Sequence, residues 1–509
     1  MITFKSLTSN STFQNSFLIT VSKISGFLRD LVVSAYFGTQ TVADAFNYAT
    51  LITGNIFVLL GGLNGPFHSA TVASLAELDR QDRHSQNLLL SRILVYSLAF
   101  FTILAALIGL LGQPILNYFW SGNPILNNAI FQQILYMLPV LILSGAVGIC
   151  FGANCFYGRT GAPSLSPLLS SLALIAVILA GYQPLGGAVL GIGTSLGAVL
   201  QVGQQIRILH AGGFKFAWSD FIDLQPFQRL LYPALLSSTV GSLNVYVDSI
   251  FCGLLPIGSW TAILLGNRLI QLPFGVLVGG SLVSFLPRLT EHKNDLVAFR
   301  DLTEREFSNL FFMLMPLCVL LIALAIPMIE LVFQRGVFDQ NSTQLVGAVV
   351  LGLTFSMLTG LPRELFTRVY YALGDSETPF RVSIFAIVCN FLFDLILYKS
   401  LGVGGIALST TLTALINSIL LIHFLPADYR PRLPWLKMLL LGLLGWLVHT
   451  VTTMLYHWLK LPILSGIGAP LLDLEVLCKV SLCSLIGLGV YFLLAMPVHF
   501  VVKARQMID

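Results

Sequence analysis

The sequence predicts an all-α integral membrane protein with fourteen transmembrane helices. Hydrophobic residues make up 56% of the 509-residue chain, charged residues only 10%, and the mean hydropathy is +0.85, whereas soluble domains carry about 25% charged residues. Apolar runs of roughly twenty residues, enough to cross about 30 Å of hydrocarbon as a helix, recur along the chain. These runs are about twice as long as the strands of a membrane β-barrel, so they predict helices.

The spans follow one another along almost the whole chain, and each connecting segment contains Gly, Pro or a charged residue, as turns and loops do. The first span is too long and too charged for the core of a signal peptide, so we expect it to be retained. An even number of spans places both termini on one side of the membrane. The predicted spans cover residues 13–37, 45–74, 93–112, 130–154, 164–182, 187–209, 231–255, 260–286, 307–328, 344–369, 381–398, 404–424, 436–458 and 473–497.

Charge placement predicts that both termini are cytoplasmic. Of the 27 Lys and Arg in the chain, 18 lie on the side of the termini and four on the other side. The four are Arg335, Lys399, Lys460 and Lys479. Because cytoplasmic loops carry the excess of Lys and Arg, the side with 18 is the cytoplasm. The net charge of +4 therefore reflects topology and not nucleic-acid binding.

The chain also contains an internal duplication. LITGNIFVLLGG (51–62) resembles LIQLPFGVLVGG (269–280), CFYGRTGAPSLSPLLSS (155–171) resembles YYALGDSETPFRVSIFA (370–386), and LGGAVLGIGTSLGAVL (185–200) resembles VGGIALSTTLTALINS (403–418). The three pairs keep their order and nearly the same spacing. We therefore predict two six-helix lobes, 1–228 and 229–428, related as parallel repeats around a central cavity, with two extra helices in 429–509. This is the architecture of an alternating-access transporter.

Ionisable side chains inside the spans are the candidates for function. Each costs about 2.5 to 3.5 kcal/mol at a helix centre, so most should face a wet cavity or a partner. Simpler alternatives are that Asp30 neutralises Arg29 or Lys23, and that Lys23 or Arg368 reaches the headgroups. The set comprises Lys23, Arg29, Asp30, Asp44, Asp248, Arg268, Glu364, Arg368 and Asp394.

Arg29 and Arg268 lie several helical turns from the nearest charged loop and come from opposite lobes. A cavity lined by Arg from both lobes suits an anionic substrate, because guanidinium forms paired hydrogen bonds with phosphate oxygens. The sequence has no Walker A loop and no HExxH motif. Energy for transport would then come from an ion gradient or from the membrane potential.

A second cluster predicts a sodium or proton site in the second lobe. Asn390 and Asp394 are four residues apart and share one helix face. Asp248, Thr410 and the backbone carbonyl of Ile406 would complete an all-oxygen set, which suits a hard cation. The alternative is a polar network that only holds the helices together. The matching positions of the first lobe are close to Leu174, Ile178 and Ile192, which are apolar.

Six motifs resemble the MurJ/MviN lipid II flippase family, within the multidrug and oligosaccharidyl-lipid exporter superfamily, over residues 15–425. They are GFLRD (26–30), ADAF (43–46), NRLIQLPFGVL (267–277), FLPRL (285–289), FQRGVFD (333–339) and YALGDSETP (371–379). The chain departs from better-known members between Arg29 and Arg80, where it has no Lys or Arg, with Phe57 near the expected place of an Arg. Asn267 and Gln271 stand where some relatives have acids.

The resemblance implies a fourteen-helix transporter that moves undecaprenyl-diphosphate-linked peptidoglycan precursor to the outer leaflet of the bacterial plasma membrane. It also implies a cationic cavity for the diphosphate, to which Lys23, Arg29, Asp44 and Arg268 match by motif, and a lipid-tail groove beside the last two helices. Some members have a sodium site among the helices that carry Asp248 and Asp394. The expected partners are lipid II or a related glycolipid, membrane lipids and the cell-wall synthesis machinery. No cofactor is expected besides a coupling Na⁺ or H⁺.

Four other functions remain open at this point. One is a flippase for another polyprenyl-diphosphate oligosaccharide, which cavity charge does not distinguish from a lipid II flippase. A drug or cation antiporter would need the opposite cavity lining. A membrane enzyme acting on the same lipids would need acidic or His residues on a substantial outer loop, whereas 113–129 and 459–472 are mainly apolar or amide-bearing. A purely structural division component would leave the intramembrane Arg residues unexplained.

Overall fold

The computed structural model describes residues 11–57, 65–78, 82–119, 123–159, 161–218, 222–432, 434–459 and 474–505. These residues form helices and connecting turns, with no strand among them. The chain divides into two compact units, Met1–Tyr246 and Val247–Asp509. The division falls inside helix α12 (Gln225–Cys252), so this one helix contributes to both units. The domain boundaries expected from the duplication stay predictions.

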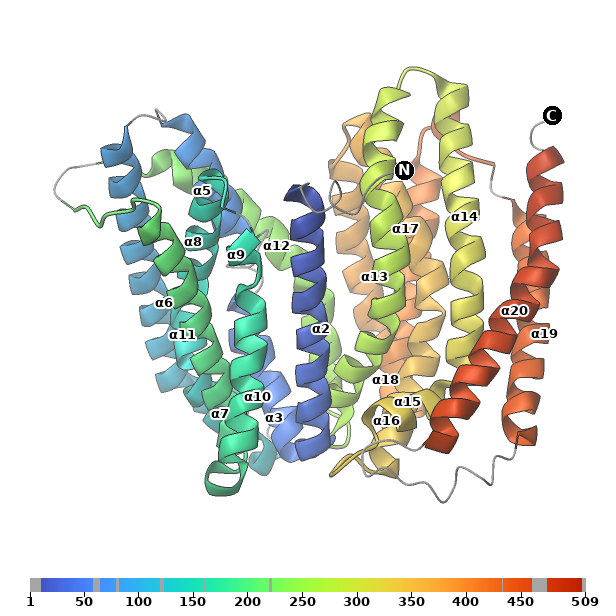
Figure 1. The fold of residues 1–509 in the computed structure, drawn as a ribbon, viewed down its shortest axis with the longest axis horizontal. Coiled ribbons are helices and arrows are strands. Elements are labelled where there is room, and N and C mark those ends of the chain that lie inside the picture. The colour runs from blue at the N-terminus through green and yellow to red at the C-terminus, as the bar shows by residue number, and fades with distance from the viewer. Residues whose placement is uncertain are drawn as a thin grey trace. The chain divides into compact units, whose positions relative to one another are not determined.

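The first unit is built around Phe67, Leu90, Phe101 and Ile149, which are buried together in one apolar core. Its helices run alongside one another in Figure 1, with α10 packed on α11 and α5 on α8. Besides the first part of α12, they are α2 (Ser11–Phe37), α3 (Thr41–Ala49), the π-helical segment η1 (Thr50–Gly54), α5 (Pro66–Glu77), α6 (Arg83–Phe119), α7 (Pro124–Ile142), α8 (Ser144–Phe156), α9 (Gly161–Ser164), α10 (Ser166–Leu185) and α11 (Ala188–Ala211).

The second unit contains the end of α12 and the remaining helices. In Figure 1 the last two helices lie side by side, and α19 packs against α14. Leu324 and Cys483 are buried in the core that α20 shares with its neighbours. The helices are α13 (Ser259–Glu291), α14 (Leu296–Ala323), α15 (Ala325–Phe333), α16 (Gln340–Thr354), α17 (Ser356–Leu373), α18 (Glu377–Phe424), the short 3₁₀ segment η2 (Ala427–Tyr429), α19 (Trp435–Trp458) and α20 (Leu474–Arg505).

The helices confirm a multi-pass membrane protein. Within the described ranges, eight helical stretches are long and apolar enough to cross a membrane, and the pair α16 and α17, bent by 45°, makes a ninth if it is one span. Each of the predicted spans overlaps between one and three of the observed helical elements. Helix α18 alone covers two of them. At 1.5 Å per residue its 48 residues would extend about 72 Å if straight, more than twice the hydrocarbon thickness.

Helix α18 avoids this length by folding back at Gly402, whose backbone angles (φ 57°, ψ −136°) favour glycine. Side-chain contacts between Asp394 and Ser409 and between Asn390 and Thr413 show that the two limbs run antiparallel. The limbs approach closely, because a Cβ at Gly405 would lie 2.4 Å from the carbonyl oxygen of Leu397. A side chain at Gly405 would therefore force the hairpin apart.

The first unit contains the same turn. Gly186, between α10 and α11, has φ 53° and ψ −130°, nearly the angles of Gly402. The two glycines are 216 residues apart (402 less 186), close to the spacing of the sequence duplication. This spacing places Thr194, and not Ile192, at the position that matches Thr410.

Two of the sequence motifs form helix ends. In FQRGVFD, the Arg335 guanidinium donates to the carbonyls of Leu331 and Val332, at 2.6 and 2.8 Å, and so satisfies the last turn of α15. The Asp339 carboxylate accepts the backbone N–H of Ser342 at 2.8 Å at the start of α16. The hydrogen bonds from Ser342 lower the pKa of Asp339.

The YALGDSETP motif forms a cytoplasmic turn in the predicted topology. Gly374 ends α17 with a φ of 84°. The Asp375 carboxylate accepts the backbone N–H groups of Glu377 and Thr378, at 2.9 and 3.0 Å, and the Thr378 hydroxyl at 2.7 Å. Hydrogen bonds from Thr378 hold the pKa of Asp375 below its usual value. Both motifs therefore have a local structural explanation.

Candidate functional site

The candidate site lies in the second unit, where the end of α12 meets the hairpin of α18. Asp248 comes from α12, and Asn390 and Asp394 come from the first limb of α18. Asp394 is fully buried, Asn390 is 1% exposed and Asp248 is 9% exposed. Because these three side chains are polar and enclosed, they must satisfy one another.

Asn390 joins the two carboxylates. Its Nδ2 donates to Asp248 Oδ1 at 2.6 Å and to Asp394 Oδ2 at 3.3 Å, so each amide hydrogen serves one acid. Its Oδ1 accepts the Thr413 hydroxyl at 3.2 Å. The amide therefore uses both of its donors and its acceptor inside the cluster.

Hydroxyl groups of the second limb complete the cluster. Ser409 Oγ donates to Asp394 Oδ1, and Thr410 Oγ1 lies 3.4 Å from Asp248 Oδ2. Both hydroxyls also lie near the Ile406 carbonyl, at 2.9 and 3.2 Å. Since a hydroxyl has one hydrogen, each hydroxyl can donate either to a carboxylate or to the Ile406 carbonyl. When it donates to Ile406, it can present an oxygen lone pair to a bound cation.

The cluster holds more acid than it can neutralise with its own side chains. The hydrogen-bond partners of the two acids described above are an amide and two hydroxyls, which carry no positive charge. Two ionised carboxylates in one buried site repel each other, so a proton or a bound cation is expected to compensate them. The cluster therefore has the electrostatic requirement of a coupling site.

The donor set fits a hard monovalent cation. Two carboxylates, the Asn390 amide, the Thr410 hydroxyl and the Ile406 carbonyl offer oxygen atoms only. Asn390 would have to turn its amide to present Oδ1. Within the residues that the structure describes, no group of three or more His, Cys, Asp or Glu could hold a metal ion. The oxygen atoms of the cluster suit a hard cation.

The structure brings together all five residues predicted for the ion site, and it adds Ser409 and Thr413, which the sequence analysis missed. Both residues could have been found from the pairing across the hairpin. Residues whose numbers add to 803 face each other across Gly402, as Asp394 with Ser409 and Asn390 with Thr413 do. Without the position of the turn, that pairing could not be assigned.

The first unit closes the equivalent space without acidic groups. The spacing of 216 residues matches Asn390 and Asp394 to the buried Leu174 and Ile178. It matches Ser409 and Thr413 to Gly193 and Gly197. A Cβ on Gly193 would lie 2.7 Å from Leu174 Cδ1, and one on Gly197 would lie 2.7 Å from Ser170 Oγ. The hairpin of α10 and α11 therefore packs without acidic side chains. Packing alone does not explain why the second unit has acids at these positions.

The predicted cationic residues of the first unit lie on α2. Arg29 donates to Asp30 Oδ1 through Nε at 3.0 Å and Nη2 at 2.7 Å, which is the pairing that the sequence analysis gave as a simpler alternative. Both side chains are partly exposed, at 31% and 16%. Lys23 is exposed. Asp44 is buried in the first turn of α3, where the helix dipole favours a negative charge.

The second unit places Arg268 on α13, with an exposed side chain. On α17, Glu364 pairs with Arg363 at 2.8 Å and with Arg368 at 3.0 Å, which leaves one net positive charge in this group. Because Arg29 and Arg268 belong to different units, their convergence on one cavity stays a prediction.

Comparison with known proteins identifies the family. The family model described as "Lipid II flippase MurJ" matches residues 33–466. A protein of Synechocystis sp. named "Probable lipid II flippase MurJ" is 33% identical over 418 residues, which cover 77% of this chain and 76% of that relative. This chain belongs to the MurJ family. A further MurJ relative, from Thermotoga maritima, is 26% identical over 412 residues and covers 79% of this chain and 82% of its own length.

Solved structures agree with a MurJ fold. The structure titled "Lipid II flippase MurJ, inward closed conformation" matches with a TM-score of 0.77 at 20% identity, and covers 94% of this chain and 98% of that one. An inward-facing multidrug resistance MATE family transporter of the MOP superfamily matches with a TM-score of 0.62 at 13% identity, over 81% and 96% of the two chains. At these identities the likeness concerns the fold. The family predicted from the six motifs is confirmed.

Proposed function

We propose that this protein flips lipid II, the undecaprenyl-diphosphate-linked peptidoglycan precursor, from the inner to the outer leaflet of the bacterial plasma membrane. Family membership carries the proposal: the MurJ model covers residues 33–466, and the Synechocystis relative is named a probable lipid II flippase. The protein acts as a transporter and performs no covalent chemistry on the lipid.

The proposed architecture has fourteen spans in two six-helix lobes and two additional helices at 429–509, with both termini in the cytoplasm. The matching turns at Gly186 and Gly402 support the duplication, because two independent hairpins share one unusual backbone conformation. The surplus of Lys and Arg on one side supports the orientation. Alternating access would then expose a central cavity to each side in turn.

Lys23, Arg29 and Arg268 would bind the diphosphate, with Asp44 supporting the cationic set. The guanidinium of Arg29 has five N–H donors, of which Nε and one Nη2 hydrogen serve Asp30, so others can serve a phosphate. The Asp30 contact also fixes the orientation of the guanidinium before substrate arrives, which reduces the entropy lost on binding.

The cluster of Asp248, Asn390 and Asp394 would couple transport to sodium or protons. Its buried carboxylates support this role, and the apolar matching positions in the first unit argue against a purely structural need for them. Cation binding would draw α12 and both limbs of α18 together, since each contributes an oxygen.

Rescue of cells depleted of their own lipid II flippase tests the proposal. We expect this protein to restore growth and lipid II in the outer leaflet, and Arg29→Ala to abolish both. Arg305→Ala is the matched control, because that Arg is 59% exposed on α14 and lies 3.6 Å from the exposed Asp301. Growth without outer-leaflet lipid II would reject lipid II as the substrate in favour of another polyprenyl-diphosphate oligosaccharide.

A further inference from the structure

A pocket lies in the first unit, away from the candidate site residues described above. It encloses about 520 Å³, within the range of roughly 300 to 1,000 Å³ typical of ligand sites. Helices α5, α6 and the start of α12 form its walls. The charged and amide side chains at its mouth are Arg92, Asp223, Gln225 and Gln228.

The pocket changes from polar to apolar along its depth. Arg92 lies at the edge of a predicted span, and Phe100, two turns further along α6, is roughly 12 Å deeper at 1.5 Å per residue. On α12 the polar Gln225 and Gln228 give way to Tyr232 and Leu235 in the same direction. A pocket with a polar mouth and an apolar interior fits an amphiphile.

The apolar end opens onto the lipid-facing side of α6. Only 22% of the most apolar window of this helix is buried. Phe100, Ile103, Leu107 and Leu110 are exposed by 60%, 63%, 48% and 75%, and their spacing of three or four residues places them on one face. An acyl chain leaving the pocket would therefore continue along this stripe.

The mouth has the composition of a membrane interface. The Arg92 guanidinium lies 5.5 Å from the ring centre of Trp218, and Tyr96 packs against the same ring at 6.2 Å. The backbone N–H of Ala217 donates to Ser91 Oγ at 3.0 Å and holds this segment on α6. Trp and Tyr favour the headgroup level. A guanidinium has five donors, so contact with an aromatic face is compatible with binding a phosphate through its edge.

We propose that this pocket binds an acidic glycerolipid with a hydroxyl-bearing head group, such as phosphatidylglycerol. Arg92 binds the phosphate, and Asp223, Gln225 and Gln228 bind the head-group hydroxyls. Two amides favour hydroxyls over an ammonium group, because a hydroxyl both donates and accepts whereas an ammonium only donates. The one carboxylate at the mouth, Asp223, already accepts the backbone N–H of Gln225 at 2.9 Å, which leaves it less available to an ammonium group. The acyl chains occupy the space beside Phe100 and Tyr232.

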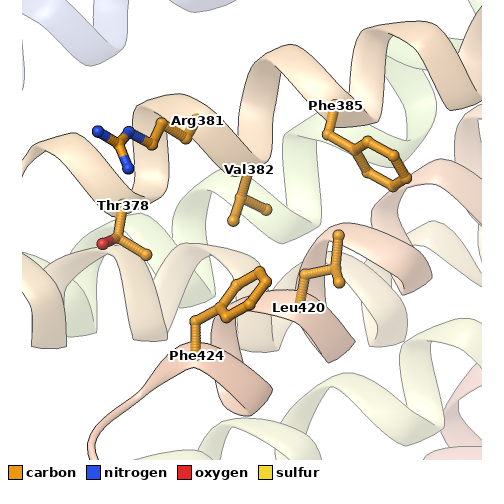
Figure 2. A pocket seen from close by; sticks show the side chains of 6 residues that line it. All are labelled: Thr378, Arg381, Val382, Phe385, Leu420 and Phe424. Carbon is orange, nitrogen blue, oxygen red and sulfur yellow. The ribbon is translucent and has the colours of Figure 1, made fainter.

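Another pocket of about 520 Å³, between the limbs of α18, provides a comparison (Figure 2). Figure 2 shows Val382 facing Leu420 and Phe424 across it, with Phe385 to one side. Its one charged lining residue, Arg381, pairs with Glu377 at 2.5 Å, and both side chains are more than 70% exposed. The other polar lining residue, Thr378, donates its hydroxyl to Asp375 at 2.7 Å. Because both polar groups already have partners, this pocket indicates no ligand.

Binding by the full-length purified protein in detergent tests the proposal, with native mass spectrometry of added phosphatidylglycerol, phosphatidylethanolamine and phosphatidylcholine. We expect phosphatidylglycerol to bind about tenfold more tightly than the other two, and Arg92→Ala to lower its affinity about tenfold. Arg92→Lys should lose less, since it keeps the charge. Gln228→Leu should reduce the preference for phosphatidylglycerol over phosphatidylethanolamine.

Arg83→Ala is the matched control. Arg83 lies on the same helix, nine residues earlier, with its guanidinium 4.5 Å from the ring centre of Tyr157, but does not line the pocket. A photoactivatable phosphatidylglycerol should label the α6 and α12 peptides that contain Tyr96 and Tyr232, and unlabelled lipid should compete. Equal affinities of Arg92→Ala and Arg83→Ala, equal binding of all three lipids, or labelling elsewhere would overturn the proposal.

Discussion

Replacing Asp394 by Asn should remove the response of the protein to sodium. Asp248 Oδ1 and Asp394 Oδ2 both contact Asn390 Nδ2, at 2.6 and 3.3 Å, so these two oxygens are at most about 5.9 Å apart, the sum of the two distances. At an effective dielectric constant of about 20, two full charges at that separation repel by about 3 kcal/mol, and by more if closer. A bound cation relieves this repulsion, which corresponds to about a hundredfold in an equilibrium constant.

Thermal unfolding of the purified protein measures the effect, in sodium chloride and in choline chloride at equal ionic strength. Sodium at a hundred times its dissociation constant would stabilise the wild type by about 2.7 kcal/mol, or roughly 5 °C or more in Tm for a unit of this size. Asp394→Asn has one acid fewer, so its Tm in choline should equal or exceed that of the wild type. Its Tm should not change on addition of sodium.

Ser409→Ala is the control that separates charge from packing. It removes a hydroxyl donor to the same carboxylate, at a cost of about 1.5 to 3 kcal/mol, but keeps both acids. This variant should be less stable in choline and should still respond to sodium. If neither sodium nor mild acid stabilises the wild type, or if Asp394→Asn keeps the full response, the cluster is a structural network.

Three further predictions concern transport, orientation and local stability. Arg29→Ala and Arg268→Ala should each abolish flipping at normal abundance, because loss of a cation from an anion site costs about 2 to 5 kcal/mol of binding, and Lys should rescue only partly; normal lipid II turnover in either Ala variant would refute the diphosphate role. Single cysteines at positions 81 and 294 should be shielded from an impermeant thiol reagent in intact cells and those at 123 and 340 labelled, and the reverse pattern would invert the topology. Asp375→Asn should lower stability by about 1 kcal/mol through the weakened helix start. Because the pKa of Asp375 is lower in the folded than in the unfolded state, this contribution is present above about pH 4 and is lost as the pH falls through the folded pKa; a difference in Tm that does not shrink in acid would contradict the assignment.

Hydropathy predicted the fold well because membrane insertion imposes a simple rule on the sequence. Every predicted span overlaps observed helix, since about twenty apolar residues can satisfy their backbone in hydrocarbon only as a helix. Hydropathy did not predict the π-helical segment at Thr50–Gly54 or the break at Leu324 between α14 and α15. Both change the backbone without changing the hydrophobicity, so composition carries no signal for them.

The candidate ion site was predictable in part. Asn390 and Asp394 share a helix face by spacing alone, but their contacts with Ser409 and Thr413 depend on where the hairpin turns. The sequence also suggested Ile192 as the match of Thr410, and the angles of Gly186 and Gly402 replace it with Thr194. A weak sequence repeat can be aligned with an error of two residues, whereas the matching glycine turns fix which residues of the two units correspond.

The turn at Gly402 also limits how the length of this protein can vary. The limbs meet with almost no loop between them, so the fourteen residues that separate Asp394 from Ser409 fix the position of one side chain relative to the other. One inserted residue would rotate the second limb by about 100° and shift it by about 1.5 Å, which would carry the hydroxyls away from the acids. Functional relatives should therefore differ here by substitution and keep their insertions for the long loops, and an epitope tag placed at this turn should abolish the sodium response while the same tag in a cytoplasmic loop preserves it.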